Sequence, residues 1–106
     1  MPFKLIFEPE ALNTLRDFEH DDDRKDPVKL KKVRICLARI ERNPKYPGLQ
    51  SHKYNDKKGK NGEDIWESYV ENNNPSAWRV FWHYGPDKNE ITVLLITPHP
   101  KTKSKK

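Results

Sequence analysis

Three short segments rich in aromatic and β-branched residues follow one another in the last third of the chain, at residues 65–70, 78–84 and 91–97. Runs of this length and composition are typical of β-strands. The segments between them, 72–75 and 85–89, contain Asn, Gly, Pro and Asp, which favour tight turns. The pattern therefore predicts three consecutive strands that pair as an antiparallel meander and end at Pro98-His99-Pro100.

The first half of the chain has the periodicity of a short strand and two amphipathic helices. Residues 3–7 place three apolar side chains on one face and predict a strand. Residues 9–20 begin with a proline and carry apolar side chains at helical spacing. A second helix is predicted over residues 27–42, because Asp26-Pro27 is typical of the start of a helix and Asn43-Pro44 of its end.

This order of elements, β-α-α-β-β-β, predicts an α+β fold. We expect the helical hairpin to pack on one face of a small, mainly antiparallel sheet, with the other face open for a ligand. Residues 45–62 contain three glycines and several lysines and predict a mobile basic loop, in which a short strand near 49–54 could form.

The length of 106 residues predicts one domain over residues 1–100, followed by a disordered lysine-rich tail at 101–106. Hydrophobic residues make up only 33% of the chain, so its core must be small. No apolar run is long enough for a membrane span or a signal peptide. The single cysteine, Cys36, falls in a helical pattern and is expected in the core. We therefore expect a cytoplasmic protein without membrane association.

The net charge of +5 is unevenly distributed along the chain. Basic side chains concentrate in residues 27–44, in residues 45–62 and in the tail. A polyanionic partner would explain this distribution, and so would a solvated lysine-rich surface. Charge alone leaves both interpretations open.

Alternation along residues 78–84 separates two sets of side chains. Trp78, Val80, Trp82 and Tyr84 should point toward the helices, and Arg79 and His83 toward the other face. The tryptophans could form the core or stack on bases. The sequence has neither a cluster with metal-ligand spacing nor a glycine-rich phosphate loop, so we expect no metal and no cofactor.

Several motifs, in their order and spacing, resemble the RelE/ParE superfamily, the toxins of type II toxin–antitoxin systems. They are Asn43-Pro44-Lys45-Tyr46-Pro47-Gly48-Leu49-Gln50-Ser51-His52, then Gly62-x-x-x-Trp66-x-Ser68-Tyr69-Val70, Trp78-Arg79-Val80-Phe81-Trp82 and Pro98-His99-Pro100. The resemblance covers nearly the whole chain and implies the fold of that superfamily. Its members include ribosome-dependent mRNA endonucleases, gyrase poisons and proteins with neither activity established.

The resemblance also implies roles for individual residues. Arg79 matches an arginine of RelE-type nucleases, and His99 matches a C-terminal histidine of YoeB-like members. Where such nucleases often carry a basic residue on the first meander strand, this chain has Glu67 and Ser68. We expect RNA contacts from the basic loop and from the second meander strand, at His52, Lys53, Lys57, Lys58, Lys60 and His83.

Metal-free RNA cleavage requires a base, an acid and a cation that stabilises charge on phosphorus. Arg79 suits the cation role because its guanidinium stays charged and binds phosphate through two nitrogens. His99 suits the acid or base role, and Glu67 could act as a base. The alternatives are an ion pair between Arg79 and Glu67 across the sheet, and an exposed histidine at the strand end.

Three functions remain open on this basis. The first is a toxin that cleaves mRNA in the ribosomal A site. The second is a ParE-like gyrase inhibitor or an inactive relative that acts by binding, and the third is a nucleic-acid-binding domain without cleavage. The expected partners are the ribosome and mRNA, or gyrase, and a cognate antitoxin. The antitoxin would cover the helical hairpin or the basic groove with an amphipathic or acidic segment.

Overall fold

A computed structural model of the chain describes residues 2–71 and 77–98. Three predicted features lie outside these residues: the turn at 72–75, the pair His99-Pro100 and the tail at 101–106. The elements follow the chain in the order β1 (Lys4–Phe7), α1 (Pro9–His20), α2 (Pro27–Arg42), the 3-10 turn η1 (Pro47–Leu49), β2 (His52–Lys58), β3 (Asp64–Tyr69), β4 (Trp78–Tyr84) and β5 (Glu90–Pro98).

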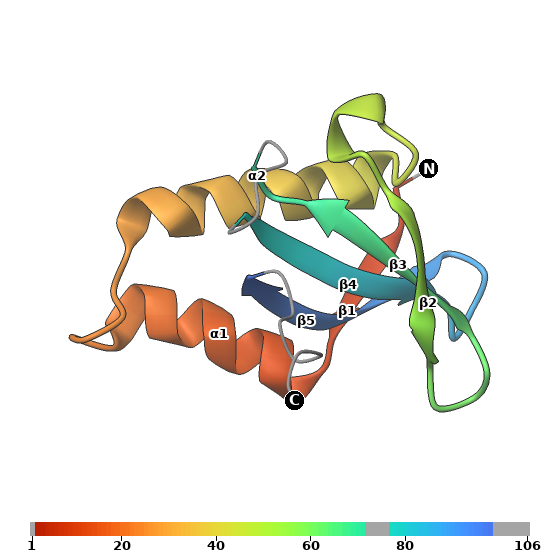
Figure 1. Cartoon of the computed structure of the whole chain (residues 1–106), viewed down its shortest axis with the longest axis horizontal. Helices are drawn as coiled ribbons and strands as arrows, with labels where there is room; N and C mark the ends of the chain where they lie inside the picture. Colours follow the sequence, from red (N-terminus) through yellow and green to blue (C-terminus); the bar gives the residue numbers. More distant parts are fainter. Residues whose placement is uncertain (1, 72–76, 99–106) are drawn as a thin grey trace.

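The predicted α+β fold is confirmed, with one strand more than the basic pattern. The five strands form a mixed sheet in the order β1-β5-β4-β3-β2 (Figure 1). Only β1 and β5 pair in parallel, and the other pairs are antiparallel. The additional strand is β2, which lies within the predicted basic loop and forms one edge of the sheet.

Both helices begin where the sequence predicts. Pro9 occupies the first turn of α1, and Pro27 that of α2. The Asp26 carboxylate accepts a hydrogen bond of 3.0 Å from the backbone N–H of Lys29, which satisfies one of the free donors at the start of α2. The corresponding residue of α1, Glu8, makes no side-chain cap.

The core lies between the helical hairpin and one face of the sheet. α2 contributes Val33, Cys36 and Ile40, and β4 contributes Val80 and Trp82, all of them buried. Burial raises the pKa of the Cys36 thiol to about 12, so this cysteine is an inert core residue, as predicted.

A hydrogen-bonded relay fastens the segment before β2 to the core. The Trp82 indole N–H donates to Ser68 Oγ at 2.8 Å, and the Ser51 hydroxyl donates to the carbonyl oxygen of Pro44 at 3.1 Å. The two serine hydroxyls are 2.6 Å apart. Since the Ser51 proton is committed to Pro44, Ser68 is the donor between them, and the relay runs in one direction.

Candidate functional site

The candidate site lies on the helix-free face, the side of the sheet opposite α1 and α2. The alternation along β4 is as predicted, with Val80 and Trp82 in the core and Arg79 on the helix-free face. β3 contributes Glu67 to the same face, and β2 contributes His52. Three neighbouring strands thus place three ionisable side chains side by side.

These three side chains form a continuous chain of contacts, which we call the His52–Glu67–Arg79 chain. Arg79 Nη1 lies 2.6 Å from Glu67 Oε2, and His52 Nε2 lies 2.9 Å from Glu67 Oε1. The register explains both contacts. His52 stands directly opposite Glu67, while Arg79 stands opposite Tyr69 and so reaches Glu67 along the diagonal.

The inner end of this chain is buried although no helix covers it. Arg79 is 7% exposed and Glu67 is 4% exposed. The guanidinium carbon lies 4.5 Å from the centre of the Tyr69 ring, and the Tyr54 ring packs against Phe81 at 5.0 Å. The aromatic residues of β2 and β3 therefore fill part of the face that the sequence predicted to be open.

Arg79 forms the ion pair with Glu67 that the sequence offered as the alternative to phosphate binding. One oxygen of Glu67 is occupied by Arg79, and the Nε of Arg79 has no partner among the described residues. Burial of the guanidinium, together with its contact to Glu67, therefore limits what can reach it. The outer end of the chain differs, because the His52 side chain is 48% exposed.

The imidazole ring of His52 lies between two hydrogen-bond acceptors. Nδ1 lies 3.0 Å from the carbonyl oxygen of Gln50, and Nε2 contacts the carboxylate of Glu67. A carbonyl and a carboxylate accept hydrogen bonds, so each ring nitrogen faces a group to which it can donate. The two contacts fix the orientation of the ring, and Glu67 has a basic side chain on each side.

The other residues predicted to bind RNA do not converge on this chain. His83 is buried, and its Nδ1 contacts the carbonyl oxygen of Tyr84 at 2.8 Å. Lys53 and Lys58 both pair with Asp64, whose pKa is lowered first by the hydrogen bond from Lys58 and then by the charge of Lys53.

Lys57 and Lys60 are exposed, and His99 lies outside the described residues. Among residues 2–71 and 77–98, no group of three or more His, Cys, Asp and Glu side chains could hold a metal ion. Within the same residues, no helix has the length and apolar character needed to cross a bilayer.

The sequence did not reveal the contact between His52 and Glu67. Its only signal was the proximity of His52 to the Gly-x-x-x-Trp strand. The pairing partner of His52 depends on β2, which has an irregularity between Tyr54 and Lys58 that no sequence pattern marks.

No protein-family model matches the sequence, and no curated protein is similar to it in sequence. The fold, however, is similar to those of solved toxins. The YoeB/ParE toxin from Agrobacterium tumefaciens superposes with a TM-score of 0.66 at 13% identity, over 92% of this chain and 99% of that toxin.

Two further structures agree. The YoeB dimer from Staphylococcus aureus has a TM-score of 0.63 at 17% identity, over 94% of this chain and 100% of that one. A chain of the archaeal RelE–RelB complex from Pyrococcus horikoshii has a TM-score of 0.65 at 12% identity, over 95% of this chain and 99% of that one. The chain thus has the RelE-like fold, as the sequence motifs predicted.

Proposed function

We propose that this protein is the toxin of a toxin–antitoxin pair and that it cleaves RNA without a metal ion on the helix-free face of its sheet. The observation that carries the proposal is the His52–Glu67–Arg79 chain, in which a half-exposed imidazole and a guanidinium contact the two oxygens of one carboxylate. The shared fold with YoeB and RelE structures supports it at the level of architecture.

In this proposal Glu67 occupies the place that a substrate phosphate would take. Its carboxylate lies between His52 and Arg79 and contacts both side chains before RNA arrives. A phosphodiester that enters the site would compete with Glu67 for them. Arg79 would then stabilise the negative charge that develops on phosphorus, because its charge persists throughout the reaction.

His52 is the group best placed to act as the acid. As an imidazolium it can donate a proton to the departing 5′-oxygen, and Glu67 fixes the orientation of its ring. We retain His99 as the proposed base for the 2′-hydroxyl. Glu67 is less suited to that role because both of its oxygens are occupied.

The test is ribosome-dependent cleavage of mRNA by the purified protein, with mapping of the new RNA ends. His52→Ala should lower the cleavage rate by about 10²–10⁴-fold, the usual contribution of a positioned acid. Lys25→Ala, which removes an exposed lysine between α1 and α2, is the control and should retain the rate. Undiminished cleavage by His52→Ala would refute the role of His52.

The same proposal includes an antitoxin. A RelE-like fold was solved in complex with RelB, which supports a protein partner for this chain as well. Co-expression with the product of a neighbouring small reading frame should suppress the toxicity of this chain and yield a stable complex.

A second candidate function is favoured by the ion pair itself. Because Glu67 neutralises Arg79, the chain could act as a ParE-like gyrase inhibitor, or as an inactive relative, through protein contacts alone. Induction in cells separates the candidates. New mRNA ends support the nuclease, whereas DNA breaks with intact mRNA support the gyrase inhibitor.

A further inference from the structure

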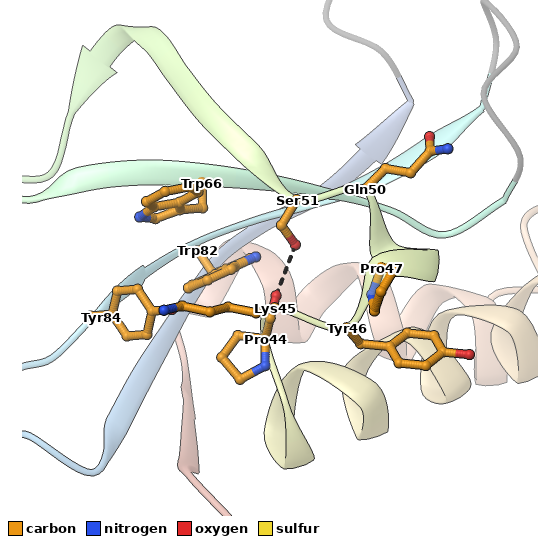
Figure 2. Close-up of a pocket in the computed structure, with 9 residues that line it drawn as sticks. All are labelled: Pro44, Lys45, Tyr46, Pro47, Gln50, Ser51, Trp66, Trp82 and Tyr84. Carbon is orange, nitrogen blue, oxygen red and sulfur yellow. Dashed lines mark hydrogen bonds between the residues drawn. The ribbon is translucent and has the colours of Figure 1, made fainter.

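A pocket of about 570 Å³ opens on the side of the sheet that carries the helices, where the end of α2 passes into β2 (Figure 2). One wall is aromatic and consists of Trp66, Trp82 and Tyr84. The opposite wall is the segment 44–47, with Ser51 beside it. The volume falls within the range of small-molecule sites.

The aromatic wall is held in one arrangement by its own contacts. Trp66 and Trp82 are nearly parallel, with ring centres 6.0 Å apart and an angle of 19° between them. The ring of Tyr84 meets Trp82 edge-on at 5.1 Å. The relay from Trp82 through Ser68 and Ser51 then ties this wall to the segment opposite.

The opposite wall is also fixed. The Arg39 guanidinium lies 5.0 Å from the centre of the Tyr46 ring. On Gly48 a Cβ atom would lie only 2.6 Å from Cε2 of that ring, so the ring packs directly on the glycine. The pocket is therefore formed before any ligand arrives, which lowers the entropic cost of binding.

Cationic groups stand at the aromatic wall. Figure 2 shows the Lys45 side chain extending across the pocket toward Tyr84. In the described part of the chain no ion pair involves the Lys45 ammonium. Lys53 contributes a second ammonium, 5.9 Å from the centre of the Trp66 ring.

We propose that this pocket binds a nucleotide, with the base against Trp66 and Tyr84, the partly exposed rings of the aromatic wall, and the phosphate at Lys45. Aromatic side chains stack on any base, and an ammonium at the mouth complements a phosphate. A purely apolar ligand would leave Lys45 without a partner. The inference goes beyond cleavage and does not depend on it, because Trp66 and Glu67 point to opposite faces of β3.

The nucleotide could be free or a unit of single-stranded RNA. β2 is the edge of the sheet, and its successive residues His52 and Lys53 lie on the two sides of that edge. A strand of RNA that follows this edge would contact both surfaces. In that case an oligonucleotide binds more tightly than a mononucleotide. At a site for free nucleotides, the additional nucleotides of an oligonucleotide would not increase the affinity.

The experiment is a titration of tryptophan fluorescence with AMP, adenosine and a 2′-O-methyl RNA trinucleotide that cannot be cleaved. AMP should quench saturably, and Lys45→Ala should weaken its binding roughly three- to tenfold without changing that of adenosine. Lys25→Ala removes an exposed lysine between α1 and α2 that does not line the pocket, and it should bind AMP like the wild type. Tighter binding of the trinucleotide identifies RNA as the source, and equal binding identifies the free nucleotide.

Three results would overturn the proposal: no saturable quench at millimolar concentrations of any probe, wild-type AMP affinity in Lys45→Ala, or displacement of AMP by an acidic tryptophan-containing peptide that binds more tightly. The last would identify a docking site for a protein. The result is separable from the nuclease proposal, because His52→Ala should lose cleavage and keep AMP binding.

Discussion

At the scale of single residues, Glu67 decides what Arg79 can do. This buried carboxylate contacts a guanidinium at 2.6 Å and an imidazole at 2.9 Å, so each of its two oxygens has a side-chain partner. It also means that a substitution at either residue affects stability as well as chemistry. Loss of activity in an Arg79 variant is therefore informative only when folding is measured alongside it.

We predict that Arg79→Ala lowers the free energy of unfolding by about 3–5 kcal/mol, because Glu67 is left as a buried charge without its main partner. Urea denaturation monitored by circular dichroism measures the change. The double variant Arg79→Met/Glu67→Leu, which removes both charges, should recover most of the loss. If it is less stable than Arg79→Ala, the pair is stabilising in itself and this account of the loss is wrong.

The site was predictable in part, and the limit lies at this scale. Alternation along residues 78–84 was enough to direct Arg79 away from the helices, and its pairing with Glu67 was one of two expected outcomes. The role of His52 needed the exact partner of each β2 residue. That partner is set by side-chain packing at the sheet edge, such as Tyr54 on Phe81, and local sequence does not encode it.

At the scale of elements, the two helices begin differently although each starts with proline. α2 has a carboxylate cap at Asp26, whereas Glu8 at the same position of α1 has an acidic side chain that makes no cap bond. This pair provides an internal comparison of two acidic residues at helix starts.

We predict that Asp26→Ala destabilises the protein by about 1 kcal/mol, through loss of the hydrogen bond to the Lys29 N–H. Glu8→Ala is the matched control and should cost clearly less. Equilibrium urea denaturation of both variants gives the comparison. Equal losses would show that charge near the helix start, and not the cap bond, is what matters.

Element boundaries were largely predictable because strong local signals mark them. Asp26-Pro27 and Asn43-Pro44 enclose α2, and the turn residues enclose β4 and β5. β2 was harder to define, since its sequence is polar and Tyr54 is the one residue within it that is partly buried. An edge strand gains its structure from the neighbour that it pairs with, so periodicity carries little information about it.

At the scale of the whole molecule, a charged clamp joins α2 to the end of β3. Glu71 Oε2 lies 3.0 Å from Lys29 Nζ and 3.6 Å from Lys32 Nζ. Burial pushes the pKa of Glu71 up, but the hydrogen bonds from Lys29 and from the backbone of Trp78, together with the two lysine charges, lower it overall. Helix and sheet are thus coupled through a group that titrates in acid.

Because the folded pKa of Glu71 is depressed, its contribution to stability is complete above the unfolded value of about 4.3 and is lost as the pH falls below it. We predict that Glu71→Gln flattens the fall in unfolding free energy on acidification below about pH 5. Lys29→Met, which removes the partner, should flatten the same region. Urea midpoints measured between pH 3 and pH 7 test this, and unchanged slopes in both variants would refute it.

The pairing of β1 with β5 brings together the two ends of the chain, with Leu5 beside Ile91. During translation the first strand therefore leaves the ribosome long before its neighbour exists, and long-range parallel pairing of this kind forms late. A polypeptide released early, without β5, would leave β1 with no strand partner and β4 unpaired along one side. The sheet is thus complete only after residues 90–98 have been synthesised.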